Sequence, residues 1–187
     1  MITAMLRKLV KWRDYALARL RARAVAAALL DGRPVHRILV VCYGNIFRSP
    51  FVEACLKTAC AKPHVFEIRS AGFHPRAGRE VEQGFRRIAQ TFNVDLAPHR
   101  SRCLDRHDLE WADLILIMDG HNYRLMHQNY HVHLEKCIWL GAVSGATPIL
   151  IKDPYKRPPP VQLRIARQLH AACAALGDRL MRTATAS

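Results

Sequence analysis

The chain has 187 residues, half of them hydrophobic, which is enough apolar material for one folded domain and excludes wholesale disorder. Its formal net charge of +14 favours anionic partners such as phosphates, lipid head groups or nucleic acid. The six cysteines include no Cys-x-x-Cys pair, which argues against a zinc ribbon or a thioredoxin-type site. No secretory signal peptide is visible, so we expect free thiols in a reducing cytoplasm.

The first element in the chain is a long helix predicted over residues 5–30. Residues 1–33 carry eight basic and two acidic side chains, and these charges interrupt every apolar run, so the helix cannot span a membrane. An Asp-Gly-Arg-Pro sequence at 31–34 ends it. Three interpretations remain open: a helix that is solvated or docked on the domain, an amphipathic helix on an anionic membrane surface, or, for a eukaryotic source, an organelle transit peptide. We therefore divide the chain into a basic helical extension, 1–33, and a globular domain, 34–187.

Beyond residue 34, short apolar runs alternate with amphipathic segments, a pattern typical of an α/β fold around a parallel sheet. The expected strands are residues 37–42, 65–72, 113–119 and 136–141. The expected helices are residues 49–61, 80–92, 108–112, 122–130 and 161–181, the last preceded by a rigid turn at 156–160. Ser49 is suited to cap the first of these helices, with Pro50 as its first helical residue.

Residues 43–49 connect the first strand of this pattern to its first helix. In open parallel sheets, ligands bind beyond the carboxyl ends of strands, where this segment lies. The unpaired amides and the dipole of the following helix attract anions, and successive loop amides add a nest for oxygens. Gly44 permits unusual backbone angles, and Asn45 tolerates left-handed geometry and can brace the loop. The segment therefore predicts an oxyanion cradle.

Cys42 stands at the entrance of this loop and Arg48 near its end. The loop amides, the helix dipole and Arg48 all favour the ionised thiol, which is a strong nucleophile. The Arg48 guanidinium suits two phosphate oxygens, and Ser49 can donate to the thiolate or help it leave. The predicted chemistry is attack of sulfur on a phosphate monoester, followed by hydrolysis of the cysteinyl-phosphate. An inert core thiol beside a surface arginine is the weaker alternative, because Cys-x5-Arg-Ser encloses Gly-Asn between strand and helix.

This mechanism needs a general acid to protonate the leaving oxygen. The candidate is Asp153, because the Asp-Pro pair that it forms with Pro154 fixes a carboxylate on a turn. Taken alone, an ordinary Asp-Pro turn would explain these residues equally well.

Residues 41–50, Val-Cys-Tyr-Gly-Asn-Ile-Phe-Arg-Ser-Pro, closely resemble the phosphate loop of the low-molecular-weight protein tyrosine phosphatases. Four further stretches resemble that family in the same order: 70–72 (Ser-Ala-Gly), 99–102, 113–126 and 153–155 (Asp-Pro-Tyr). The resemblance covers about residues 36–182. It implies a four-stranded parallel sheet flanked by helices, with the phosphate loop between the first strand and the next helix. It also implies a two-step mechanism without metal or cofactor.

The resemblance also implies roles for individual residues. Cys42 would be the nucleophile, Arg48 the phosphate clamp and Asp153 the general acid. The phosphate-binding residues would be Tyr43, Gly44, Asn45, Ile46, Phe47, Arg48 and Ser49. Tyr43 and Tyr155 would form the groove for the aromatic ring of the substrate, and His99 and Asp119 would support the site indirectly.

The sequence departs from the family pattern at two places. Phe47 occupies the position of a second cysteine that can form a protective disulfide with the nucleophile, so we expect Cys42 to lack that rescue after oxidation. Lys156, Arg157 and Pro158 follow Asp-Pro-Tyr and make the rim of the pocket more basic.

The expected function is hydrolysis of phosphotyrosine in proteins and of small aryl phosphates. If the source is bacterial, a tyrosine autokinase of polysaccharide export is the expected partner by analogy. The expected location is cytoplasmic, or peripheral at an anionic membrane through residues 1–30, with no specific nucleic acid.

Two alternatives remain open. An arsenate reductase would need a resolving cysteine pair, and Cys103 and Cys137 are far apart in the sequence. A non-catalytic anion-binding module would leave Cys42, Arg48 and Asp153 without a use. His127 and His131 are spaced for a metal on a helix but lack an acidic partner nearby, so we expect a solvated surface there.

Overall fold

The structure is a computed structural model of the whole chain. It describes the backbone of residues 2–60 and 65–185, and the side chains of residues 13, 15–60 and 65–184.

A four-stranded sheet forms the centre of the fold, with strands β1 (Arg37–Cys42), β2 (Glu67–Gly72), β3 (Leu114–Ile117) and β4 (Cys137–Trp139). The strand order is β2-β1-β3-β4 and every pair is parallel, which confirms the predicted four-stranded parallel sheet. All residues of β1 after Arg37 are buried, because helices cover both faces of the sheet, and this explains the uninterrupted apolar run in the sequence. Pairing of Cys42 with Gly72 aligns the carboxyl ends of β1 and β2.

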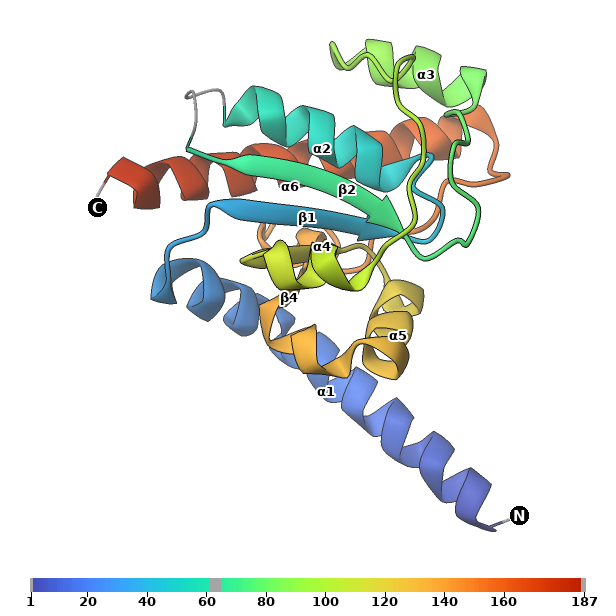
Figure 1. The fold of residues 1–187 in the computed structure, drawn as a ribbon, viewed down its shortest axis with the longest axis vertical. Coiled ribbons are helices and arrows are strands. Elements are labelled where there is room, and N and C mark those ends of the chain that lie inside the picture. The colour runs from blue at the N-terminus through green and yellow to red at the C-terminus, as the bar shows by residue number, and fades with distance from the viewer. Residues whose placement is uncertain (1, 61–64, 186–187) are drawn as a thin grey trace.

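The helices of the domain are α2 (Arg48–Ala59), α3 (Gln83–Gln90), α4 (Arg106–Trp111), α5 (Gly120–Asn129) and α6 (Pro159–Thr185). Two 3-10 turns, η1 (His131–Lys136) and η2 (Leu140–Ala142), flank β4. Helices α2 and α6 pack together on one face of the sheet, and α4 and α5 lie on the other (Figure 1).

Several predicted boundaries are wrong: strands β2, β3 and β4 and helix α3 are shorter than predicted, and residues 140–141 of the predicted fourth strand lie in η2. Two further differences concern the starts of α2 and α6. Helix α2 begins at Arg48 and its N-cap is Phe47, so Ser49 does not cap it. The Ser49 hydroxyl instead makes hydrogen bonds with Cys42 Sγ and Asn45 Nδ2. Helix α6 begins at Pro159, inside the predicted turn, because a proline in the first helical turn lacks only an N–H that would have no partner there.

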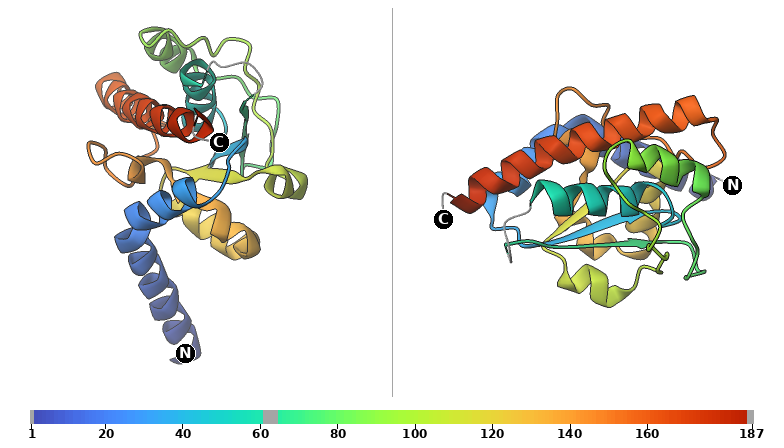
Figure 2. Two further views of the ribbon diagram at one scale, coloured as in Figure 1. Left: turned by 90° about the vertical axis from the view of Figure 1, so that its left-hand side faces the viewer. Right: turned by 90° about the horizontal axis from the view of Figure 1, so that it is seen from above.

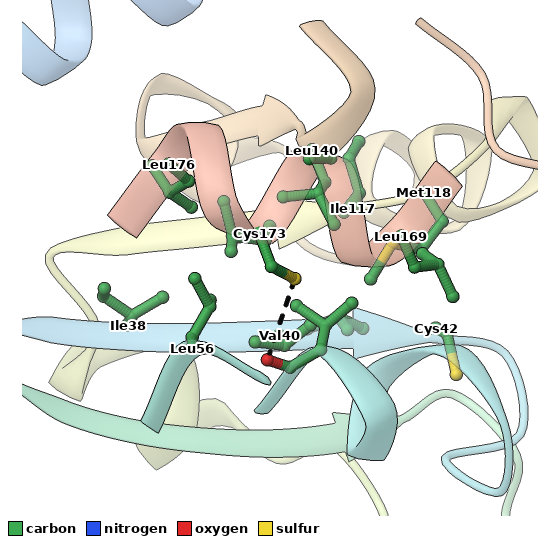
Figure 3. Packing of buried hydrophobic residues seen from close by; sticks show 14 of the residues in the cluster. Ile38, Val40, Cys42, Leu56, Ile117, Met118, Leu140, Leu169, Cys173 and Leu176 are labelled. Carbon is green, nitrogen blue, oxygen red and sulfur yellow. Dashed lines mark hydrogen bonds between the residues drawn. The ribbon is translucent and has the colours of Figure 1, made fainter. Parts of the chain in front are cut away.

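The main core lies between the sheet and the α2–α6 pair. Side chains from β1, α2 and α6 meet in Figure 3, including Val40, Leu56 and Leu169, all fully buried. The two helices approach so closely that a Cβ added to Gly177 would lie 2.8 Å from the Cβ of Ala59. The Cys42 sulfur lies at the end of this core, beside the loop that leads into α2 (Figure 3).

Helix α1 (Ile2–Gly32) confirms the predicted N-terminal helix. Its second half packs on the domain with Ala22, Ala26 and Leu30 buried in the common hydrophobic cluster. Its first half projects away from the rest of the molecule, as Figures 1 and 2 show. None of the helices in the described part of the chain has a stretch long and apolar enough to cross a bilayer.

Candidate active site

The loop between β1 and α2 presents a set of unpaired amides. Within the described part of the chain, the N–H groups of Gly44, Ile46 and Phe47 donate to no protein acceptor. The first turn of α2 adds amides that have no intrahelical partner, together with the positive end of the helix dipole. Such a concave arrangement of donors is suited to a tetrahedral oxyanion.

Asn45 holds the loop in this conformation. Its backbone is left-handed, with φ of 51°, and its side chain is fully buried. Its side-chain Nδ2 donates to Ser49 Oγ and Ser70 Oγ, each at 2.9 Å, and its Oδ1 accepts from the backbone N–H of Arg102 at 2.9 Å. The Asn45 carbonyl accepts from His99 Nε2 at 2.8 Å. The predicted bracing residues Asn45 and His99 therefore contact each other directly.

The neighbouring strand β2 shapes the same loop through Gly72. A Cβ at this position would lie 2.9 Å from both the Asn45 amide nitrogen and the Tyr43 carbonyl oxygen, so no side chain fits. Sequence reasoning gave no role to Gly72, Ser70 or Arg102. The only signal for the first two was the Ser-Ala-Gly sequence that ends a strand beside the phosphate loop.

The Cys42 sulfur is held by groups that favour negative charge. Its Sγ lies 3.0 Å from Ser49 Oγ and accepts from the Asn45 amide at 3.2 Å. The Asn45 N–H can only donate, and Ser49 Oγ, which already accepts from Asn45 Nδ2, is placed to donate, so both contacts suit a thiolate, the stronger acceptor. The predicted thiol and hydroxyl therefore lie together.

Arg48 is almost wholly buried, with 1% of its side chain exposed, and it joins the separate parts of the site. Its Nη1 donates to Asp119 Oδ2 at 2.5 Å and to the Ile151 carbonyl at 3.1 Å, and its Nη2 donates to Asp153 Oδ2 at 2.6 Å. Burial opposes the charge, but the negative charges of Asp119, Cys42 and Asp153 outweigh it and raise the pKa of Arg48.

The Nε–H of Arg48 is buried and has no acceptor among the described residues. A buried donor on a charged group is rarely left unpaired in a folded protein, because its desolvation is costly. This donor is therefore available to an oxygen of a bound anion, beside the unpaired amides of the loop.

The site opens into a cavity of about 190 Å³, lined by Cys42, Tyr43, Gly44, Ile46, Phe47, Arg48, His74, Arg79, Asp153 and Tyr155. Tyr43 and Tyr155 are about half exposed and form parts of its wall. Arg79 Nη2 donates to the Gly44 carbonyl and lies in the lining, although the sequence gave no indication of this.

Phe47 is buried, and the centroid of its ring lies 4.9 Å from that of Phe85 and 6.1 Å from that of Tyr155. The position that holds a second cysteine in the family pattern is therefore part of an aromatic cluster. All six cysteines are free. Among the described side chains, those of residues 13, 15–60 and 65–184, no group of three or more His, Cys, Asp or Glu is placed to hold a metal ion.

The chain is similar in sequence to known phosphatases. Residues 37–186 match the family model described as low molecular weight phosphotyrosine protein phosphatase. The low molecular weight protein-tyrosine-phosphatase Ptp of Acinetobacter johnsonii is 33% identical over 119 residues, which cover 64% of this chain and 80% of that protein.

Two solved structures are also similar. The tyrosine phosphatase AmsI of Erwinia amylovora aligns with a TM-score of 0.71 and 27% identity, over 82% of this chain and 95% of AmsI. The YwlE arginine phosphatase of Geobacillus stearothermophilus aligns with a TM-score of 0.71 and 26% identity, over 79% and 94% of the two chains. The names of these relatives refer to two different phosphorylated side chains.

Proposed function

The chain belongs to the low molecular weight phosphotyrosine protein phosphatase family, and on that premise we propose that it hydrolyses phosphotyrosine in proteins, with Cys42 as nucleophile. The observation that carries the proposal is the unused Nε–H of buried Arg48, in a cavity that also holds a sulfur stabilised by two donors. A phosphate group would satisfy the arginine and the loop amides together while presenting its phosphorus to the sulfur.

In the first step, the Cys42 thiolate forms an S–P bond while the P–O bond to the leaving group breaks. The loop amides and Arg48 stabilise the charge on the three equatorial oxygens, and preorganised donors of this kind are usually the largest contribution to catalysis. Asp153, in its protonated form, gives its proton to the leaving phenolate oxygen. Its Oδ1 accepts from the Tyr155 amide at 3.0 Å, which fixes the carboxyl group beside the ring that lines the pocket.

In the second step, water attacks the phosphorus and the S–P bond breaks. Asp153, now a carboxylate, takes a proton from the water, and inorganic phosphate leaves. The thiolate that departs is stabilised by Ser49 Oγ and the Asn45 amide. The steps require no metal ion, because Arg48 and the amides supply the positive charge.

The walls of the cavity favour phosphotyrosine over phosphoarginine. Tyr43, Ile46, Phe47 and Tyr155 offer apolar and aromatic surface to a phenyl ring. A guanidinium group in the same place would meet Arg79, which carries the same charge. Asp153, the carboxyl group among the residues that line the cavity, is already engaged by Arg48.

The test is hydrolysis of p-nitrophenyl phosphate at about pH 6 in chelator, with wild type, Cys42→Ser and Asp153→Asn side by side. We expect turnover by wild type, none by Cys42→Ser, and a loss of roughly 10²–10⁴-fold in kcat for Asp153→Asn, the usual contribution of a general acid. Peptides with phosphotyrosine or phosphoarginine then decide the substrate. Retained turnover by Cys42→Ser contradicts the mechanism, and thiol-dependent arsenate reduction without phosphatase activity favours the reductase alternative.

The proposal extends to partner and location. A cationic rim with Arg79 and Lys156 suits a phosphotyrosine flanked by acidic residues. As the protein partner we propose a tyrosine autokinase of bacterial polysaccharide export, which the enzyme would oppose in the cytoplasm. Six free thiols support a reducing compartment. Dephosphorylation of such a kinase in the producing cells, lost in Cys42→Ser, tests this pairing.

The projecting half of α1 is proposed to contact an anionic membrane surface, since it is rich in basic residues. The test is sedimentation with anionic and neutral vesicles of the full chain and of a Lys8→Glu, Lys11→Glu variant. Binding to anionic vesicles that this variant loses supports the proposal. The same charge change at the exposed Arg164 and Arg167 of α6 is the matched control, and equal loss in both variants contradicts a specific role for α1.

A further inference from the structure

We propose that α1, which lies outside the residues matched by the family, positions the partners of Arg48 through Tyr15 and Arg23. These two would be positioning residues for the phosphatase reaction, so the inference rests on the proposed function. Helix α1 contacts both chain segments that supply those partners, the start of α5 and the segment between η2 and Asp153.

The first contact is made by Tyr15, at the start of α5. Its ring lies 6.0 Å from the Tyr123 ring and 6.3 Å from the Trp139 ring. Its phenol end occupies the place of a missing side chain, since a Cβ on Gly120 would lie 2.5 Å from Tyr15 Oη. Gly120 is the first residue of α5 and directly follows Asp119.

Asp119 is held from three sides at this point. Its Oδ1 accepts from the Asn122 amide at 2.8 Å, its carbonyl accepts from Trp139 Nε1 at 3.3 Å, and its Oδ2 bonds to Arg48. Tyr15 packs on the indole that donates to the Asp119 carbonyl and on the residue that follows Asp119. A shift of Tyr15 therefore changes the position of the carboxylate that orients Arg48.

The second contact is made by Arg23. Its guanidinium donates to the Ser144 carbonyl and, at 3.0 Å, to the Thr147 carbonyl. The chain continues from Thr147 to Ile151, whose carbonyl accepts from Arg48 and whose amide donates to the Met118 carbonyl at 2.8 Å. Asp153 comes two residues later, so Arg23 fixes the chain segment that leads to the other two acceptors of Arg48, the Ile151 carbonyl and Asp153 Oδ2.

The helix itself is anchored firmly enough to serve as a brace. Ala22, Ala26 and Leu30 are buried, and Arg179 of α6 pairs with Asp31 at 2.6 Å and donates to the Ala27 carbonyl at 3.1 Å. Misplacement of reacting groups by about 1 Å can cost on the order of 100-fold in rate. Loosening either contact should therefore impair phosphate binding and turnover without removing any group that touches the substrate.

The experiment compares Tyr15→Ala and Arg23→Ala with Arg19→Ala in the full chain. Arg19 is exposed on the same helix and has no hydrogen-bond or ion-pair partner among the described residues. We expect kcat/KM for p-nitrophenyl phosphate to fall about tenfold in each of the first two variants, and to stay unchanged in Arg19→Ala. Tyr15→Phe, which keeps the ring, should retain most of the wild-type rate.

A crossed variant separates positioning from simple loss of stability. Gly120→Ala introduces the Cβ that collides with Tyr15, so it should lower kcat/KM by itself. Adding Tyr15→Ala removes the collision, so the double variant should lose much less than the product of the two single effects. Multiplicative effects would mean that the two sites act independently, and the proposal would then be wrong.

Affinity for inorganic phosphate, measured by calorimetry, gives a readout that does not depend on turnover. If wild type proves not to be a phosphatase, weaker phosphate binding in Tyr15→Ala and Arg23→Ala still supports the brace. Arg23→Ala removes no buried apolar side chain, so it keeps the test in force if Tyr15→Ala does not fold. Unchanged phosphate affinity and kcat/KM in folded variants, with only a lower free energy of unfolding, overturn the proposal.

Discussion

Asn45 gives a quantitative test of how the phosphate loop is held in place. The perturbation is replacement by glycine and, separately, by alanine. Both remove three side-chain hydrogen bonds, those to Ser49, Ser70 and Arg102, from a buried site. At a net contribution of about 1 kcal/mol each, their loss should lower the free energy of unfolding by about 3 kcal/mol in Asn45→Gly.

Alanine should be the worse of the two replacements. At the Asn45 φ of 51°, alanine carries a strain of roughly 1–2 kcal/mol that glycine avoids and that asparagine, which tolerates left-handed geometry, largely avoids as well. Where φ is unrestricted, alanine is instead more stable than glycine by about 0.4–1 kcal/mol, because glycine has more freedom in the unfolded chain. The sign of the difference between Asn45→Ala and Asn45→Gly therefore reports the backbone conformation of the loop.

The assay is urea unfolding, with equal slopes required before the free energies are compared. Asn93 is the matched control, because it is exposed, has a φ of 58°, and makes no side-chain hydrogen bond to a described residue. Asn93→Gly should change stability by less than about 0.5 kcal/mol, the usual limit for a surface site. The reasoning is refuted if Asn45→Gly costs no more than Asn93→Gly, or if Asn45→Ala is more stable than Asn45→Gly.

Two further predictions concern packing and pH. Gly177→Ala should lower the free energy of unfolding by roughly 1–3 kcal/mol, because its Cβ collides with Ala59. Gly84→Ala is the control, because the space around Gly84 is open and the added Cβ should cost nothing. Urea unfolding of both variants checks this, and equal effects would contradict it. Burial opposes ionisation of Asp113, but hydrogen bonds from Arg37 lower the pKa of Asp113 to about 2. The ionised Asp113 therefore stabilises the fold above about pH 4, and this contribution is lost as the pH falls towards 2. Asp113→Asn should therefore cost on the order of 1–2 kcal/mol at pH 7 and almost nothing near pH 2, and a constant difference between these pH values would rule the mechanism out.

Much of the fold could be predicted because its signals are local. The strand that ends at Cys42 is a continuous apolar run, and the spacing from Cys42 to Arg48 spans one loop between a strand and a helix. The alternation of strands and helices after residue 34 was enough to predict a parallel sheet. The exception among local signals was Ser49, whose hydroxyl contacts Cys42 and Asn45 rather than capping the helix.

What the sequence did not predict depends on contacts between distant segments. Ser70 and Arg102 brace Asn45 from 25 and 57 residues away, and although both lie in stretches that resemble the family, their local sequence does not show that they contact Asn45. Arg79 reaches the pocket through a hydrogen bond to a loop carbonyl 35 residues earlier. The sequence does not decide whether α1 docks, because its buried face uses alanine at positions such as Ala22, and alanine gives only a weak hydrophobic pattern.

The buried alanines of α1 have a consequence for how the protein is divided. The match to the family begins at residue 37, but the hydrophobic cluster already includes Ala22, Ala26 and Leu30. The segment shared with relatives and the segment that packs as one body are therefore different lengths of chain. A fragment cut at the family boundary would expose the surface of β4 that α1 contacts. For this protein, the boundary given by sequence similarity is a poor guide to where a stable fragment begins.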